Sequence, residues 1–368
     1  MIRQQSRIAA ATSQTSQTCQ TSETYDPLSQ PPQNPSKPYL APMNTISWGM
    51  IGCGDVTEVK SGPAFQKATG SKLVAVMRRN AALAEDYARR HNVPKWYANA
   101  QQLIDDPEIN AIYIATPPSS HEAYTLAALN AGKPVYVEKP MTTNADSAKI
   151  MSRVAREKDV KLVVAHYRRE QPLFKKIKQL IDEKAIGDIR FAAIDFRKAV
   201  LSAAELAVPK TAWRVDQQIA GGGLFHDLAP HQIDLMYYFF GEIVRANGVA
   251  TNQAGAYSAD DMVAGNILFK NGVVFSGTWS FAAAKQSETD RCTIVGSTGE
   301  LQFSIFNHEP LVMINNGERT SFSFEPLPHV QQPMIQAATD YFLGKRDNPC
   351  TADEGVVVTS ILDKFTAR

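Results

Sequence analysis

The chain has 368 residues, of which 44% are hydrophobic and 20% are charged, and its formal net charge is +1. So small a charge gives no electrostatic reason to expect nucleic acid or a membrane surface as a partner, and no apolar run approaches the roughly 20 residues that cross a bilayer. The four cysteines are scattered without a C-x-x-C pair, so we expect neither a disulfide framework nor a metal site. The length suits two domains, and we expect a cytoplasmic globular protein.

Residues 1–45 differ in composition from the rest of the chain. Ser, Thr, Gln and Pro dominate this stretch, which therefore has too little apolar surface to offset its ordering entropy. We predict a disordered leader. Arg3 and Arg7, with no acidic residue before Glu23, weakly resemble an organelle transit peptide, whereas Met43 is an alternative start of translation. Whether residues 1–42 belong to the mature protein is left open.

From residue 46 onward, short apolar runs alternate with helical periods. The predicted strands are 47–51, 73–77, 111–115, 134–137 and 161–165, and the predicted helices are 56–69, 81–91, 101–105, 121–131 and 144–158. Strands that are continuous apolar runs and alternate with helices indicate a parallel sheet covered on both faces. We therefore predict an α/β fold with a doubly wound Rossmann domain over residues 46–165. Ligands of such sheets bind beyond the carboxyl ends of the strands.

A glycine turn follows the first predicted strand. Gly52 can adopt a backbone shape that a Cβ forbids, and Gly54 allows the chain to approach a pyrophosphate closely. The helix that follows begins near Asp55 and Val56, and its free N–H groups would face the phosphates. Thr57 stands where the G-x-G-x-x-G pattern has Gly or Ala. Whether the helix packs closely on the strand is therefore left open. A glycine-rich turn in any α/β domain is the alternative interpretation.

The end of the second predicted strand indicates which cofactor would bind. A free ribose 2′-hydroxyl is usually met by an acidic residue about 20 residues after the glycines. No acidic residue stands there, and Arg78 and Arg79 do. Two guanidinium groups suit a 2′-phosphate. We predict NADP rather than NAD, with NAD and a solvated basic turn as the alternatives.

Two further strand ends carry candidate residues. Thr116 and Pro117 form a turn that leads to a helix beginning at His121, with capping as the simpler interpretation. Glu138 and Lys139, followed by a proline, end the next strand. Beside a nicotinamide, the lysine would supply positive charge near the reacting oxygen, although the tripeptide alone is also typical of a surface turn.

From residue 166 the pattern changes to an α+β domain that extends to residue 368. A helix over 172–183 and a strand over 189–197 precede a triple glycine at 221–223 and a long helix over 224–240. The strands predicted after it are 243–252, 261–269, 272–281, 290–296, 299–305, 310–314 and 319–324, and two helices, 328–344 and 352–366, follow. Strands joined by tight turns indicate an antiparallel sheet.

The long helix carries the second candidate site. Asp227 and His231 are four residues apart, so their side chains lie one above the other on a helix. Histidine, with an unperturbed pKa of about 6.5, suits proton transfer near neutral pH. The carboxylate could orient the imidazole or bind a substrate hydroxyl. An ordinary helix-stabilising pair is the alternative.

Three motifs in this order resemble the glucose–fructose oxidoreductase/inositol dehydrogenase family from about residue 46 to the end. They are Gly52-x-Gly54, Glu138-Lys139-Pro140, and the triple glycine followed by Asp227-x-x-x-His231. The resemblance implies a Rossmann domain followed by a domain with a large open antiparallel sheet. It also implies hydride transfer between a nicotinamide and a sugar, cyclic polyol or related carbonyl compound. An open sheet predicts a homodimer or homotetramer.

The resemblance also assigns roles to residues. Lys139, Asp227 and His231 would line the place where hydride and proton move. As a mechanism for these residues, we expect His231 to take the hydroxyl proton and Asp227 to hold His231 and the substrate. Glu138 would lie near the nicotinamide, with Trp213 and Arg214 near cofactor and substrate. The candidate substrate contacts are Tyr167, Arg168, Arg169 and Asp216, with structural ion pairs as the alternative. Two other functions stay open: an NADP-binding regulator without turnover, and a glycoside hydrolase that uses tightly bound NAD in a transient oxidation.

Overall fold

A computed structural model describes residues 44–366 of the chain. The predicted disordered leader and Met43 therefore lie outside the described residues.

The first sheet has six parallel strands in the order β3-β2-β1-β4-β5-β6. These strands are β1 (Ile46–Ile51), β2 (Ser71–Met77), β3 (Lys95–Tyr97), β4 (Ala111–Ile114), β5 (Val135–Val137) and β6 (Leu162–Val164). The order reverses between β1 and β4, which is the doubly wound arrangement. The prediction of this sheet is confirmed, except that β3 was missed because it has three residues and none of them is buried.

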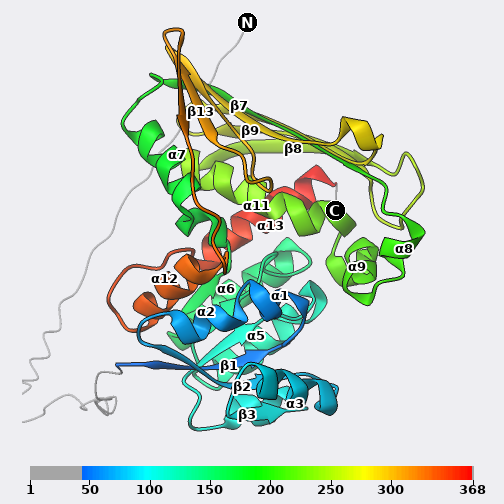
Figure 1. Ribbon diagram of the computed structural model, residues 1–368, viewed down its shortest axis with the longest axis vertical. Coiled ribbons are helices and arrows are strands. Elements are labelled where there is room, and N and C mark those ends of the chain that lie inside the picture. The colour runs from blue at the N-terminus through cyan, green and yellow to red at the C-terminus, as the bar shows by residue number, and fades with distance from the viewer. Residues whose placement is uncertain (1–43, 367–368) are drawn as a thin grey trace, which may run out of the picture. The chain divides into compact units, whose positions relative to one another are not determined.

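Helices of the first half alternate with these strands and pack around the sheet (Figure 1). They are α1 (Asp55–Val59), α2 (Gly62–Lys67), α3 (Ala81–Arg90), α4 (Ala100–Asp105), α5 (His121–Asn130) and α6 (Ala145–Lys158). The helix predicted over 56–69 is thus two helices, since α2 begins anew at Gly62 with Pro63 in its first turn. Side chains of Asn80, Asn99 and Asn144 cap α3, α4 and α6, as a short polar group does for the free N–H groups there.

The core of the first sheet is completed by residues from the end of the chain. Met334, Ile335 and Phe342 of α12 (Gln332–Phe342) belong to the same buried cluster as Trp48, and the rings of Trp48 and Phe342 lie 5.4 Å apart. Thr351 forms an isolated antiparallel bridge to Val163 of β6. The chain therefore returns to the first sheet after it has formed the second.

The second sheet has eight strands in the order β14-β13-β12-β11-β7-β10-β9-β8. They are β7 (Ile189–Ala199), β8 (Ile243–Thr251), β9 (Met262–Phe269), β10 (Val274–Ala283), β11 (Thr289–Gly296), β12 (Gly299–Phe303), β13 (Leu311–Asn315) and β14 (Glu318–Phe322). Neighbours are antiparallel apart from β7 and β10, which pair in parallel. The sheet is therefore mixed, because two strands that are not consecutive in the chain meet at its centre.

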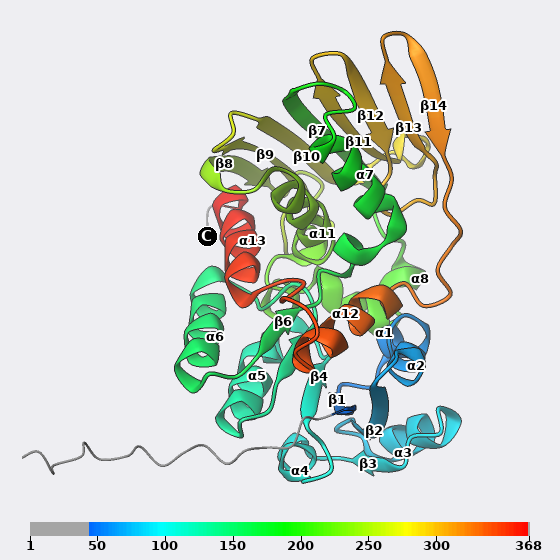
Figure 2. The ribbon, with the colours of Figure 1, turned by 90° about the vertical axis from the view of Figure 1, so that its left-hand side faces the viewer.

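Helices α7 (Pro172–Asp182), α11 (Gly223–Phe240) and α13 (Ala352–Phe365) lie on one side of the second sheet (Figures 1 and 2). Helix α11 is buried along nearly its whole length, with only Leu228, Tyr237 and Tyr238 partly exposed. Three short helices, α8 (Ala203–Leu206), α9 (Pro209–Ala212) and α10 (Gln217–Ala220), precede it. None of the described helices is long and apolar enough to span a membrane.

Candidate active site

A cavity of about 1010 Å³ lies where β1, β2, β4 and β5 end, which is the edge at which a doubly wound sheet binds ligands. The 3₁₀ turns η2 (Tyr167–Glu170) and η3 (Trp213–Val215) and helix α11 supply further parts of its wall. The predicted site residues that line it are Gly52, Gly54, Asp55, Val56, Arg78, Arg79, Thr116, Pro117, Glu138, Lys139, Tyr167, Arg168, Trp213, Arg214, Asp227 and His231. Residues as distant in the chain as Gly52 and His231 are thereby brought together around one space.

The glycine turn meets the geometric demands of a dinucleotide site. Gly52 has φ of +100°, and a Cβ there would lie 2.8 Å from backbone atoms of Ala115 and Thr116. Gly54 precedes α1, and nothing lies within 4 Å of the place where its Cβ would be. Thr57 is fully buried, and its hydroxyl donates to the Gly54 carbonyl oxygen at 2.8 Å. The third position of the pattern therefore accommodates threonine in close packing.

Arg78 and Arg79 follow β2 and line the cavity with exposed side chains. Neither forms an ion pair with any of residues 44–366. The next residue, Asn80, accepts a hydrogen bond from the Leu83 N–H and caps α3. Two unneutralised guanidinium groups at this strand end fit a phosphate on the ribose of a dinucleotide.

Glu138 is held by neutral donors at the end of β5. Its Oε1 accepts hydrogen bonds from the Tyr113 hydroxyl at 2.5 Å and from the Gln331 amide at 2.7 Å. Burial raises the pKa of this carboxyl, and the two hydrogen bonds offset that effect only in part. Glu138 is thus anchored to the first domain, with Gln331 contributed from just before α12.

Lys139 and Asp227 form an ion pair that joins β5 to α11. The Lys139 Nζ donates to Asp227 Oδ1 at 2.9 Å and to the Asp227 main-chain oxygen at 2.7 Å. Arg214 Nε lies 3.6 Å from the other carboxylate oxygen. Burial alone would raise the pKa of Asp227, but the charges of Lys139 and Arg214 outweigh it and lower that pKa below its ordinary value. Asp227 is therefore an ionised carboxylate between two cations.

His231 lies one turn further along α11 and is 4% exposed. Its ring meets those of Tyr167 and Phe306 edge-to-face, at 5.0 and 5.8 Å between centroids. Burial, and then the nearby charges of Lys139 and Arg168, hold the pKa of His231 well below its ordinary value. The imidazole is therefore neutral at neutral pH.

The expectation that Asp227 holds His231 is corrected. No hydrogen bond joins them, and His231 Nδ1 has no hydrogen-bond partner among the described residues. The Asp227 carboxylate is engaged by Lys139 and Arg214 instead. Packing against the two aromatic rings, rather than a carboxylate, orients the imidazole.

Three other candidates lie outside this cavity. Arg169 is 4% exposed and binds Asp234 and Glu354, so it has the structural role weighed as the alternative. Asp216 caps α10 by accepting from the Gln218 N–H. His121 is fully buried, with its ring nitrogens 2.7 Å from the Thr116 oxygen and 3.0 Å from the Pro140 oxygen. It therefore shapes two loops that border the cavity without facing it.

Several cavity residues were not recognised from the sequence. Those that bear on the chemistry are Lys60, Leu228, Phe306 and Gln331, and Ser119 and Ser120 also line the space. Lys60 and Gln331 lie in stretches with no motif, and their place depends on how α1 and α12 pack. Within residues 44–366 no group of three or more His, Cys, Asp or Glu side chains could hold a metal ion.

The fold and this cavity define a class: two-domain α/β proteins with a nucleotide site between a Rossmann sheet and a second sheet. Residues 46–166 match the model described as "Oxidoreductase family, NAD-binding Rossmann fold" (GFO/IDH/MocA), and residues 174–302 match the GFO/IDH/MocA C-terminal domain. The chain belongs to this oxidoreductase family. The resemblance, the fold class and the enzyme class predicted from the sequence are confirmed.

Three similar proteins illustrate the relationship. Oxidoreductase P35 of Formosa agariphila is 48% identical over 322 residues, which cover 87% of this chain and 98% of that protein. Trans-1,2-dihydrobenzene-1,2-diol dehydrogenase of Xenopus laevis is 28% identical over 292 residues, covering 78% of this chain and 83% of that protein. Levoglucosan dehydrogenase, solved with NADH and levoglucosan, superposes with a TM-score of 0.74 at 25% identity and covers 87% of this chain and 96% of that chain.

Proposed function

We propose that this protein is an NAD(P)-dependent dehydrogenase or reductase that interconverts a hydroxyl and a carbonyl group on a sugar or cyclic polyol. The observation that carries the proposal is the meeting of Lys139, Asp227 and His231 in one cavity with the glycine turn. The names of the dihydrobenzenediol and levoglucosan dehydrogenases support a cyclic hydroxylated substrate. The exposed, unpaired Arg78 and Arg79 support NADP in preference to NAD.

Each side chain has a role that follows from its charge. A bound nicotinamide supplies the hydride acceptor in the oxidative direction and the hydride donor in the reductive one. His231, neutral because of burial and nearby cations, accepts the proton of the substrate hydroxyl. The Lys139 ammonium stabilises the negative charge that develops on that oxygen. Asp227 positions Lys139 through the 2.9 Å ion pair.

The glycine turn and the two arginines bind the cofactor. Gly52 and Gly54 leave room for the pyrophosphate beside α1, and Arg78 and Arg79 bind a ribose 2′-phosphate. In the reductive direction a protonated His231 returns the proton to the oxygen. Acid–base catalysis by a positioned group contributes about 10²–10⁴-fold in rate.

The test removes each catalytic group separately. We expect His231→Asn and Lys139→Met to lower kcat by about 10² or more, with the cofactor still bound. Turnover is followed by absorbance of the reduced cofactor with a panel of sugars, inositols and diols, in parallel with NADP and NAD, and cofactor binding by fluorescence. The control is Lys149→Met, since Lys149 is a 61%-exposed lysine on α6. Near-normal turnover by either catalytic variant would refute the assignment.

Assembly and location stay predictions. Exposed valines on the second sheet, with Val244 and Val249 of β8 at 64% and 61% exposure and Val274 of β10 at 46%, support a homodimer or homotetramer formed through this sheet. The measurement is the molar mass in solution. A cytoplasmic location is likewise proposed.

A further inference from the structure

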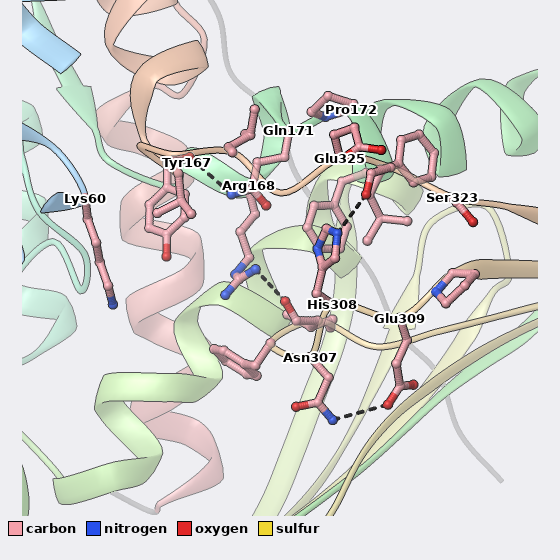
Figure 3. A pocket seen from close by; sticks show the side chains of 18 residues that line it. Lys60, Tyr167, Arg168, Gln171, Pro172, Asn307, His308, Glu309, Ser323 and Glu325 are labelled. Carbon is pink, nitrogen blue, oxygen red and sulfur yellow. Dashed lines mark hydrogen bonds between the residues drawn. The ribbon is translucent and has the colours of Figure 1, made fainter.

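The cavity at His231 continues into a second compartment of about 440 Å³. Lys60, Tyr167, Arg168 and Phe306 line both spaces and form the junction between them. Figure 3 shows Tyr167 between the two cationic side chains, with the Lys60 ammonium and the Arg168 guanidinium extending into the space. A substrate whose reacting oxygen meets His231 therefore lies within reach of this junction.

Arg168 is a fixed cation without a carboxylate partner. It is half-buried, one of its terminal nitrogens donates to the Ile305 main-chain oxygen, and its guanidinium carbon lies 4.7 Å from the centre of the Phe306 ring. Its Nε is buried without a hydrogen-bond partner. No acidic side chain among residues 44–366 forms an ion pair with it or with Lys60. A half-buried guanidinium in this state is a binding group for an anion.

Carboxylates near the junction do not neutralise the positive charges of Arg168 and Lys60. Asp227 is already engaged by Lys139 and Arg214, and Glu138 accepts from Tyr113 and Gln331. Glu309 and Glu325 line the second compartment but are exposed.

The pKa of His231 indicates the same excess of positive charge near the junction. After burial, the causes that lower its pKa are the positive charges of Lys139 and Arg168, the neighbouring His166, and then Lys60. The charged side chains that act most strongly on His231 are therefore cations.

We propose that the substrate is an acidic sugar whose carboxylate binds Arg168 at the junction, with Lys60 adding positive charge beside it. The partly exposed Phe306 contacts the sugar ring, and the second compartment takes a further substituent of that ring. This inference rests on the proposed function and specifies its substrate class.

The experiment compares matched substrates. Glucose with glucuronate, and galactose with galacturonate, are assayed with NADP and NAD, and glucose 6-sulfate tests a sulfate in place of the carboxylate. We expect a higher kcat/KM for the uronates. Arg168→Gln should lower kcat/KM for the uronates by about 10- to 100-fold, as the loss of a charged hydrogen bond does, without the same loss for neutral sugars, and Arg168→Lys should restore part of it.

The control is Arg153→Gln, which removes a 57%-exposed arginine of α6, and thermal unfolding verifies that each variant folds. Equal kcat/KM for neutral and acidic sugars, an equal loss for both in Arg168→Gln, or a preference for the sulfate overturns the inference while the proposed function stands. If no substrate turns over, binding to the protein with reduced cofactor decides: selective binding of uronates supports the carboxylate site at Arg168, refutes the proposed function, and overturns the inference that the acidic sugar is a substrate. Absence of both turnover and selective binding refutes both.

Discussion

Gly52 and Gly54 differ in what an added side chain would meet. At Gly52 a Cβ would collide with backbone atoms that follow β4, and the positive φ is strained for any other residue. At Gly54 the backbone is extended, with φ of −116°, and the space is open. The first glycine is thus required by the fold, whereas we expect the second to be required by the ligand.

This difference predicts opposite behaviour of two alanine variants. Gly52→Ala should lower the free energy of unfolding by about 1–3 kcal/mol, the usual cost of overpacking and strain. Gly54→Ala should change it by less than about 0.5 kcal/mol and weaken cofactor binding about tenfold, because its methyl group enters the phosphate space. Urea unfolding and fluorescence titration with the reduced cofactor measure the two effects. A stable Gly52→Ala, or unchanged cofactor affinity in Gly54→Ala, would contradict this account.

Single residues were predictable from sequence only where they stand in a local pattern. The glycine turn, the Glu138-Lys139 pair and His231 occur in short motifs, and all of them line the cavity. The partner of Lys139 was not predictable, because Asp227 lies 88 residues away and its carboxylate could equally have bound His231. Gln331, 193 residues from Glu138, has no sequence signal at all.

Helix α11 is the element that carries the second half of the site, and a buried arginine clamps it. Asp234, on the helix turn after His231, accepts from Arg169 at 2.7 Å, and Arg169 also donates to Glu354 of α13 at 2.6 Å. Burial raises the pKa of Asp234 to about 6 against the opposing charge of Arg169. The clamp therefore ties η2, α11 and α13 together at a substantial desolvation cost.

Breaking this clamp should destabilise the protein strongly. Asp234→Asn leaves the Arg169 charge buried with less compensation, and we expect the free energy of unfolding to fall by about 3 kcal/mol. Urea denaturation measures it, with Asp146→Asn as the control, since Asp146 is an 89%-exposed aspartate of α6. A loss below about 1 kcal/mol would show that the clamp is not a major source of stability.

At the scale of the whole molecule, three buried histidines within residues 44–366 have pKa values that burial, as the largest cause, lowers. They are His121, His166 and His231. Their pKa values are about 6.5 in the unfolded chain and lower in the folded one, so below pH 6.5 the unfolded chain binds more protons and stability falls. The raised pKa values of Asp234, about 6, and of Glu138 act in the opposite direction and offset part of this loss.

Acid should therefore destabilise the fold at a pH above the range in which carboxylates of ordinary pKa titrate. We expect the thermal midpoint to fall between pH 7 and pH 5, with a limiting slope of about 1.4 kcal/mol per pH unit for each uncompensated histidine. His231→Asn should make this dependence shallower. Calorimetry at pH 7, 6 and 5 tests it, and a midpoint that stays constant over this range would exclude the histidines as the cause.

For the molecule as a whole, the sequence predicted the two sheets but not how the chain passes from one to the other. Alternation of apolar runs identified the doubly wound sheet, and turn residues identified the strands of the second. Pairing of β7 with β10 and the return of α12 to the first core depend on contacts between distant segments. Periodicity along the chain carries no information about such pairings.

The return of the chain to its first sheet has a consequence for biosynthesis. On the ribosome, β1–β6 emerge well before residues 332–351, which supply Met334, Ile335 and Phe342 to the same core and Thr351 to the edge of β6. A nascent chain that has exposed the whole nucleotide-binding half still lacks this covering layer. The nucleotide-binding half therefore becomes complete only after residue 351 has emerged, and a chain released before residue 332 lacks the part of that half's core that α12 supplies.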